Sequence, residues 1–240
     1  MTLIYGHRGA KGEAPENTLV SFEQCLQHGV RRCELDLHLS RDGELMVIHD
    51  PTLKRTTGRR GKVVQHDADE LVNYDAREGG PGWKTPCPIP RLSELFEKCD
   101  FEHWQLEVKS ASRVRAARTV MAIKELAEQH RLLDRITVTS SSREVLRALN
   151  RLAPEISRGL VAEHNWLDPL KVARQYGCSL LALKWTLCTP ERLEKARKQG
   201  LHVSVWTVNE PALMRRLADL GVDSLITDSP GLAVSTLSRS

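Results

Sequence analysis

The chain has 240 residues, enough for one large domain or two small ones with a substantial hydrophobic core. Apolar residues make up 40% of the sequence and charged residues 28%, the balance of an ordinary soluble globular protein. The formal net charge of +4 comes from charges interspersed along the chain, so no dedicated nucleic-acid surface is expected. The mild positive charge would still attract a small anionic substrate.

The sequence also predicts the compartment. Only a few apolar residues precede His7 and no basic leader is visible, so we expect no secretory signal. No apolar run approaches the roughly 20 residues that span a bilayer. The cysteines form no Cys-x-x-Cys pair and no zinc-like spacing, which favours free thiols in a reducing cytoplasm. These six residues are Cys25, Cys33, Cys87, Cys99, Cys178 and Cys188.

The first predicted elements place polar residues at the end of a strand. A short apolar run over residues 3–7 predicts a strand that ends in the pair His7-Arg8. A helix is predicted over about 18–28, because apolar residues recur there at helical spacing and a glycine follows. The segment RCELDLHLS, residues 32–40, predicts the second strand.

A return strand follows this second strand. The segment ELMVIHD, residues 44–50, is separated from it by only SRDG, and Asp-Gly is a hairpin signal. A parallel connection needs a dozen or more residues, so the return strand must run antiparallel. A turn centred near residues 41 and 42 pairs positions whose numbers sum to about 83. This register places His49 opposite Glu34, to within one or two residues.

The next section breaks the regular pattern. Residues 51–91 are rich in glycine and proline, and we interpret them as an insertion or lid-like subdomain after the hairpin. The strand pattern resumes at HWQLEVKS, residues 103–110, and a long helix is predicted over roughly 112–131.

The second half of the chain repeats a strand and a helix. Thr189 with Pro190 begins one predicted helix and Asn209 with Pro211 begins another. The five predicted strands cover residues 136–140, 158–162, 179–183, 202–206 and 224–228. With the three earlier strands they make eight parallel strands, which predicts an α/β fold of the TIM (β/α)8 barrel type, typically about 250 residues long. We therefore expect residues 1–240 to form a single barrel domain.

Charged side chains are predicted to gather where these strands end, the place where such barrels carry catalytic groups. Period-two alternation puts Glu34 and Asp36 on one face of the second strand, and Glu107 and Lys109 on one face of the third. The predicted cluster is His7, Arg8, Glu34, Asp36, His49, Glu107 and Lys109.

This set of residue types suits phosphoryl chemistry. Three carboxylates on rigid strands suit a hard cation such as Mg²⁺ or Ca²⁺. Two flanking histidines suit general acid–base catalysis, and an arginine and a lysine offer charge to an anion. Separately, each residue also has an ordinary structural explanation, such as a solvated strand face or an ion pair lining the barrel. Their predicted adjacency favours a metal-assisted attack on a phosphodiester.

Several motifs, in order along the chain, resemble one known family. They are HRG…PENT…F from His7 to Phe22, ELDLHLSRDGELMVIHD, LEVK, SVWTVN and ITD. Together they are similar to the glycerophosphodiester phosphodiesterase family, from about residue 3 to residue 230. The family's fold is a TIM barrel with a small insertion after the His-Asp motif, which agrees with the irregular section 51–91. The resemblance implies a hydrolase that cleaves substrates such as glycerophosphocholine or glycerophosphoethanolamine to glycerol 3-phosphate and an alcohol.

The resemblance also implies roles for the clustered residues. His7 and His49 would be the acid–base pair, with the order of their roles left open. The cofactor would be one divalent cation, Mg²⁺ or Ca²⁺. Its ligands would be Glu34, Asp36 and Glu107, while Arg8 and Lys109 would contact the phosphate. The glycerol hydroxyl of the substrate would attack phosphorus, and water would open the resulting cyclic phosphate.

Other residues are less clearly assigned. Trp206 would either stack against substrate carbons or pack at the barrel rim, and Lys184 would help neutralise the phosphate. Asn17 would either shape the first loop or, the favoured interpretation, cap the first helix. His38 follows the inward pattern but lies further along the hairpin, so we leave it outside the site. The segment 139–142, TSSS, lacks the aromatic residue expected there in this family.

Four alternative functions remain open from the sequence. A lysophospholipid-cleaving enzyme would need an apolar groove at the barrel mouth, but the section 51–91 has few large apolar residues, which favours water-soluble substrates. A metal-independent phosphoinositide-cleaving enzyme is disfavoured by the three carboxylates. An inactive phosphate-binding barrel is disfavoured because both histidines are present. A nucleic-acid phosphodiesterase lacks a basic groove with stacking aromatic residues.

Overall fold

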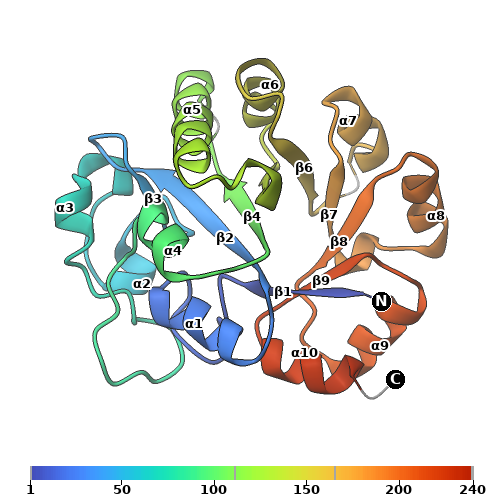
Figure 1. Cartoon of the computed structure of the whole chain (residues 1–240), viewed down its shortest axis with the longest axis horizontal. Helices are drawn as coiled ribbons and strands as arrows, with labels where there is room; N and C mark the ends of the chain where they lie inside the picture. The colour runs from blue at the N-terminus through green and yellow to red at the C-terminus, as the bar shows by residue number, and fades with distance from the viewer. Residues whose placement is uncertain (1, 111, 165, 239–240) are drawn as a thin grey trace.

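A closed barrel of parallel strands organises the molecule (Figure 1). A computed structural model describes residues 2–110, 112–164 and 166–238. The parallel strands are β1 (Leu3–His7), β2 (Arg32–Leu39), β4 (His103–Val108), β5 (Ile136–Ser140), β6 (Ser157–Ala162), β7 (Leu180–Lys184), β8 (His202–Trp206) and β9 (Ser224–Thr227). Because β1 pairs with both β2 and β9, the ring is closed. The prediction of an eight-stranded TIM barrel is confirmed.

Helices connect the strands and surround them in Figure 1. They are α1 (Leu19–Gln27), α4 (Leu92–Lys98), α5 (Arg113–Gln129), α6 (Arg143–Leu152), α7 (Pro169–Gln175), α8 (Pro190–Lys198), α9 (Pro211–Asp219) and α10 (Pro230–Leu237). Short 3₁₀ turns lie at η2 (Leu133–Arg135) and η3 (Trp185–Leu187). The last four helices have proline in their first turn, where its missing N–H is not needed.

Strand β2 shows how the barrel separates its core from its site. Leu35 and Leu37 belong to the main hydrophobic cluster, which also contains residues of the surrounding helices. Glu34 and Asp36 alternate with them and therefore point to the other face, as the period-two pattern predicts. The parallel register pairs His7 with Glu34 and Asp36 with Glu107. Polar groups of three neighbouring strands thus meet at one end of the barrel.

The predicted hairpin is present, but its register differs by one residue. Strand β3 (Leu45–Val47) runs antiparallel to β2, and Leu37 pairs with Val47, so paired residue numbers sum to 84. Beyond the two strands, the Ser40 N–H still donates to the Glu44 carbonyl at 3.0 Å, so the turn itself contains three residues, 41–43, and Gly43 supplies the positive φ (95°) that such a turn needs. The register therefore departs by one residue from the expected sum of about 83, within the one or two residues allowed, and His49 does lie beside Glu34 and Asp36. The ladder ends at Val47, and His49 reaches the cavity from the segment that follows.

Residues 51–91, called here the inserted segment, connect β3 to α4 through short elements. These are α2 (Lys54–Thr57), η1 (Val63–Gln65) and α3 (Ala68–Leu71). In Figure 1, α2 and α3 lie beside β3 at one side of the barrel. A second, smaller hydrophobic cluster holds them together: Met46, Ile48, Leu53, Val63, Ala68, Leu71, Tyr74, Ala76 and Ile89.

All six cysteine thiols are free, as expected, and five of them are buried. Burial raises the pKa of Cys25 and Cys99 to about 12, so these thiols stay protonated. Within the described ranges, no helix is long and apolar enough to cross a membrane.

Candidate active site

A cavity of about 490 Å³ opens at the carboxyl ends of the barrel strands. This volume suits a small molecule. Among the predicted site residues, those that line it are His7, Arg8, Glu34, His49, Glu107, Lys109 and Trp206. Asp36 lies buried next to it, with 1% of its side chain exposed. Lys184 is not among the lining residues.

His7, at the end of β1, is held by residues of both neighbouring strands. Its Nδ1 lies 2.6 Å from Oδ1 of Asp228, which follows β9, and its Nε2 lies 3.8 Å from Oε2 of Glu34 on β2. Burial lowers the pKa of His7, although the hydrogen bond to Asp228 acts in the opposite direction. The Nδ1 proton of the neutral ring therefore points to Asp228, which leaves Nε2 free to exchange a proton in the cavity.

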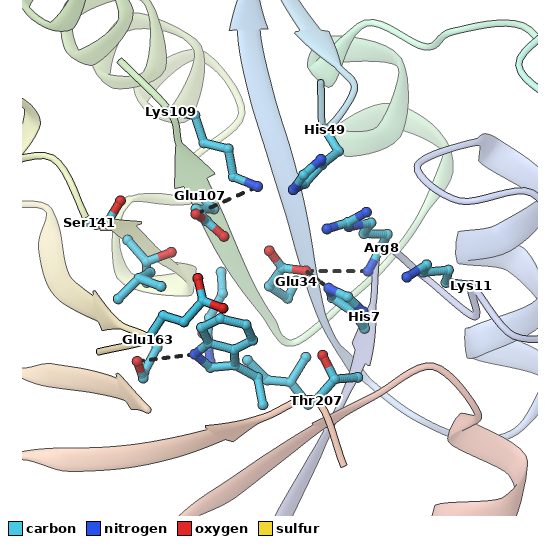
Figure 2. Close-up of a pocket in the computed structure, with 16 residues that line it drawn as sticks. His7, Arg8, Lys11, Glu34, His49, Glu107, Lys109, Ser141, Glu163 and Thr207 are labelled. Carbon is cyan, nitrogen blue, oxygen red and sulfur yellow. Dashed lines mark hydrogen bonds and ion pairs between the residues drawn. The ribbon is translucent and has the colours of Figure 1, made fainter. Parts of the chain in front are cut away.

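His49, like His7, has an aspartate at its Nδ1, but this aspartate comes from a different part of the chain. Its Nδ1 lies 2.6 Å from Oδ1 of Asp50, the next residue in the chain. Its backbone carbonyl accepts a hydrogen bond from Nε2 of His38 at 2.9 Å. Burial lowers the pKa of His49, and the negative charge of Asp36 opposes this effect. Figure 2 shows the His49 ring facing Glu34 across the cavity mouth.

The three predicted carboxylates come together as a group. One oxygen from each of Glu34, Asp36 and Glu107 lies within 4.8 Å of the others. Burial and repulsion from the neighbouring carboxylates raise the pKa of Glu34 well above its usual value and that of Glu107 to about 7. Burial would also raise the pKa of Asp36, but the positive charges of Arg8 and Lys109 outweigh it and lower that pKa.

Arg8 and Lys109 surround the most buried of these carboxylates. Arg8 Nε lies 2.9 Å from Asp36 Oδ2, and its Nη1 donates to Glu16 Oε1 at 2.9 Å. Lys109 Nζ lies 2.7 Å from Asp36 Oδ1 and 3.7 Å from Glu107 Oε1. Arg8 and Lys109 therefore balance only part of the negative charge of the three clustered carboxylates.

The backbone after β1 explains why the sequence reads Gly-His-Arg-Gly. Gly9 adopts φ = 84°, and a Cβ there would lie 2.6 Å from the backbone carbon of Ser21. Glycine therefore allows the loop to pack directly on α1. The Ser21 hydroxyl donates to the Arg8 carbonyl and accepts from the Ala10 N–H. These contacts fix the loop that presents His7 and Arg8.

Two asparagines have roles that the sequence did not predict. Asn17 Nδ2 donates to Asp36 Oδ2 at 3.0 Å, and Thr18 occupies the N-cap position of α1, so the capping interpretation of Asn17 is wrong. Asn209 likewise does not cap α9. Its Nδ2 donates to Asp228 Oδ2 at 2.7 Å, and its Oδ1 accepts from the Asp228 backbone N–H. In both places the amide supports a carboxylate of the site, and these long-range contacts leave no local signal.

The carboxylate partners of the two histidines could have been found from the sequence. Asp50 directly follows His49, and Asp228 ends the ITD motif after the last strand. A carboxylate adjacent to a candidate histidine, or at the end of a strand beside it, is a natural orienting group. His38, which we left outside the site, donates to the backbone carbonyl of His49 and so supports that residue.

The side of the cavity opposite the two histidines is lined by other kinds of side chain. Figure 2 shows Ser141 and Glu163 facing the histidine side from across the opening. Trp206 Nε1 donates to the Ala182 carbonyl at 3.2 Å, which fixes the indole at the cavity wall. Lys184 Nζ donates to Glu163 Oε1 at 3.1 Å. Lys184 is thus engaged in an ion pair beside the cavity, while small polar residues stand where an aromatic residue was expected.

The carboxylate group fits a hard divalent cation. Three carboxylate oxygens converge from two adjacent strands, β2 and β4, and oxygen donors are the ligands that Mg²⁺ and Ca²⁺ prefer. Burial, and after it repulsion from the neighbouring carboxylates, raises the pKa of Glu34 and Glu107, and a bound cation would favour their ionised form. Among the described residues, this is the group of acidic, histidine or cysteine side chains close enough to hold a metal ion.

Comparison with known proteins shows the family of this chain. Residues 7–232 match the model of the glycerophosphoryl diester phosphodiesterase family. The chain belongs to this family. A glycerophosphodiester phosphodiesterase of Caldanaerobacter subterraneus is 30% identical over 240 residues, covering 99% of this chain and 98% of the relative. Family membership and such relatives support glycerophosphodiester phosphodiesterase activity, a hydrolase function, for the chain.

Solved structures of the glycerophosphodiester phosphodiesterase family share the fold. A putative member from Silicibacter pomeroyi superposes with a TM-score of 0.91 at 26% identity, covering 100% of this chain and 94% of that one. A phosphodiesterase of Oleispira antarctica, in complex with the product sn-glycerol-3-phosphate, has a TM-score of 0.89 at 28% identity, covering 99% and 97%. The resemblance expected from the motifs is confirmed.

Proposed function

We propose that the chain hydrolyses water-soluble glycerophosphodiesters, such as glycerophosphocholine or glycerophosphoethanolamine, to glycerol 3-phosphate and an alcohol. One observation carries this proposal. Two histidines, each with Nδ1 bonded to its own aspartate, flank a cluster of three carboxylates in one cavity. The product bound to the Oleispira antarctica relative agrees with a substrate of this class.

In this proposal the cation is held by Glu34, Asp36 and Glu107, and oxygen ligands suit either Mg²⁺ or Ca²⁺. When bound, it would polarise a phosphoryl oxygen and neutralise charge on the phosphate. Arg8 and Lys109 bind the phosphate from the same side, because both already lie beside this cluster.

The two histidines move the protons. With Nδ1 bonded to an aspartate, His7 and His49 each present Nε2 for proton exchange. One accepts the proton of the attacking glycerol hydroxyl, and the other donates a proton to the departing alcohol oxygen. Water then opens the cyclic phosphate with the roles reversed. Asp228 and Asp50 stabilise the protonated rings that form in each step.

The remaining cavity wall would bind the organic parts of the substrate. Trp206 offers an apolar ring to substrate carbons, and the Nε1 hydrogen bond holds that ring in place. Lys184 would reach the phosphate only if its ion pair with Glu163 opened, so its predicted contribution is the smaller one. We also propose that residues 1–240 act as one barrel domain in the cytoplasm, which the six free cysteines support.

One observation favours a second candidate, cleavage of lysophospholipids. Trp166 is 89% exposed and Leu167 55% exposed in the loop after β6, and Trp185 is 39% exposed after β7. These loops follow the carboxyl ends of their strands, on the same side of the barrel as the cavity. An exposed aromatic and aliphatic group there would suit an acyl chain or a lipid surface.

Product analysis tests both candidates. The purified protein, supplied with Mg²⁺ or Ca²⁺, is incubated with glycerophosphocholine, lysophosphatidylcholine and a short oligonucleotide. We expect glycerol 3-phosphate and choline from the first and no cleavage of the oligonucleotide. Preferred release of choline from the lysophospholipid would favour the second candidate. Cleavage of the oligonucleotide alone would overturn the proposal.

A further inference from the structure

We propose that Arg55, on the inserted segment, is a positioning residue. It holds the Asp50 carboxylate and through it fixes the orientation of the His49 ring. This inference rests on the acid–base role proposed for His49. Arg55 does not line the cavity. Its effect on the reaction would therefore pass through its two carboxylate partners.

The Arg55 guanidinium joins two carboxylates from distant parts of the chain. Toward Asp50, Nε donates to Oδ2 at 2.8 Å and Nη2 to Oδ1 at 3.2 Å. Toward Glu16, Nη1 donates to Oε2 at 2.9 Å and Nη2 to Oε1 at 2.7 Å. Both contacts are bidentate, which fixes the planes of the carboxylates as well as their distance. A planar guanidinium can do this, whereas the single ammonium of lysine cannot.

Glu16 anchors Arg55 to the barrel. Its side chain is 8% exposed, and its second cationic partner is Arg8, whose Nη1 lies 2.9 Å from Oε1. Burial would raise the pKa of Glu16, but hydrogen bonds from Arg55 and the charge of Arg8 lower it. A buried carboxylate shared by two arginines is costly to leave unpaired. Arg55 is therefore held at a defined distance from the loop after β1.

Asp50 depends on this anchor. The aspartate is 24% exposed, so without Arg55 its carboxylate could rotate toward water. The same Oδ1 that accepts from Arg55 Nη2 lies 2.6 Å from His49 Nδ1. Rotation of Asp50 would break its hydrogen bond to the His49 ring, and His49 Nε2 would no longer be oriented toward the substrate. A displacement of about 1 Å at a reacting group can cost up to about 10²-fold in rate.

The folded inserted segment delivers Arg55 to this place. Helix α2 has only four residues and is not stable by itself. It begins after Leu53, which is fully buried in the smaller hydrophobic cluster, and Leu53 N–H donates to the Gly61 carbonyl. Gly58 ends the helix with φ = 68°. The position of Arg55 therefore reflects the packing of the inserted segment.

The same segment offers a matched control. Arg77 makes a comparable ion pair with Asp75, with Nη2 2.7 Å from Oδ2, and also donates to the carbonyls of Trp83 and Lys84. All these partners belong to the inserted segment, and neither Arg77 nor Asp75 lines the cavity. Arg77→Met removes another paired arginine of the same segment without touching the connection to His49.

The test compares steady-state kinetics on glycerophosphocholine for wild type, Arg55→Met, Arg55→Lys and Arg77→Met. We expect Arg55→Met to lower kcat about tenfold or more with little change in KM. Arg55→Lys should recover part of the loss, and Arg77→Met should keep the wild-type kcat even if both methionine variants melt at a lower temperature. Equal kcat losses for Arg55→Met and Arg77→Met would overturn the proposal, because they would report a general weakening of the segment.

A double-mutant cycle separates positioning from stability. If Arg55 acts through Asp50, Arg55→Met should lower kcat little further in an Asp50→Asn background. Losses that multiply would contradict the proposal. Should Arg55→Met fail to fold, Arg55→Gln replaces it in the cycle.

A crystal structure of Arg55→Met gives a readout that does not need activity. We expect the Asp50 carboxylate and the His49 ring to be displaced, whereas a ring unchanged from wild type would overturn the inference. If the wild type itself does not cleave glycerophosphodiesters, the proposed function fails, while this structure still decides whether Arg55 positions His49.

Discussion

The two histidines of the site are supported by two different regions of the molecule. His7 ends a barrel strand, and its partner Asp228 follows the adjacent strand, so hydrogen-bonded parallel strands fix both. His49 lies beyond a three-residue strand, and its partner Asp50 is held by an arginine of the inserted segment. The side chain of His7 is 11% exposed and that of His49 31%. Paired barrel strands therefore hold one member of the proposed acid–base pair, and the other member depends on a few ion pairs.

The two regions also have separate cores. The barrel cluster includes Leu35, Trp104, Val138 and Val205, whereas the inserted segment packs around Leu53 and Leu71. A small core contributes less stability than a large one. The inserted segment is therefore the region in which local opening would first affect the reaction. This difference predicts how variants on the two sides will behave.

The largest effect is expected from the histidines themselves. His7→Ala and His49→Ala should each fold normally and lose about 10²- to 10⁴-fold in kcat, because each removes a proton-transfer group. Steady-state kinetics on glycerophosphocholine, with circular dichroism as a check of folding, measures both. A variant that keeps a near-wild-type rate would remove that histidine from the mechanism.

The carboxylates should set the metal requirement, and they belong to the barrel side alone. Glu34→Ala or Asp36→Ala should raise the concentration of Mg²⁺ or Ca²⁺ needed for half-maximal activity by about 10-fold or more, since each removes a ligand. Activity is measured against metal concentration. Glu13→Ala, which removes the half-buried partner of His28 outside the cluster, is the control and should titrate like wild type. An unchanged midpoint in the Glu34 and Asp36 variants would refute the ligand assignment.

Substitution of the two aspartates that bond to the histidines compares the barrel with the inserted segment directly. Asp228→Asn and Asp50→Asn should each lower kcat by about 10-fold or more, because the ring loses the carboxylate that orients it and stabilises its protonated form. Asp228 also accepts from Asn209, so its substitution disturbs two contacts within the barrel. Asp100→Asn, at an exposed ion pair with Arg135, should leave kcat unchanged. If both site variants matched this control, the orienting role would be wrong.

The smallest effect concerns stability in acid. Burial would raise the pKa of Asp228 and Asp50, but hydrogen bonds from His7 and Arg55 lower each to about 2. Because these values lie below the unfolded pKa of about 3.9, the stabilisation is complete above pH 4 and is lost as the pH falls through 2. Each contributes at most about 3 kcal/mol, and Asp50 less because solvent screens it more.

Urea unfolding at pH 5 and pH 2.5 checks this prediction. The wild type should lose more of its free energy of unfolding over this interval than Asp228→Asn does. Asp50→Asn should fall between the two. Equal losses in all three proteins would show that neither aspartate is held at a low pKa in the folded state.

The fold and the centre of the site were predictable because their signals are local or periodic. Strand spacing gave the eight parallel strands, and alternation in β2 gave Glu34 and Asp36. The hairpin register departed by one residue from the expected sum because the three-residue turn closed by Gly43 was not recognised. The Arg55 contacts were not predictable, because Glu16, Asp50 and Arg55 meet only after the inserted segment has folded against the barrel.

We propose that the protein is a metal-dependent glycerophosphodiesterase. The most direct test measures the release of glycerol 3-phosphate from glycerophosphocholine before and after EDTA treatment. We predict that EDTA abolishes the release and that added Mg²⁺ or Ca²⁺ restores it. Release that continues undiminished in EDTA would contradict the account, because the three clustered carboxylates would then have no metal to hold during the reaction.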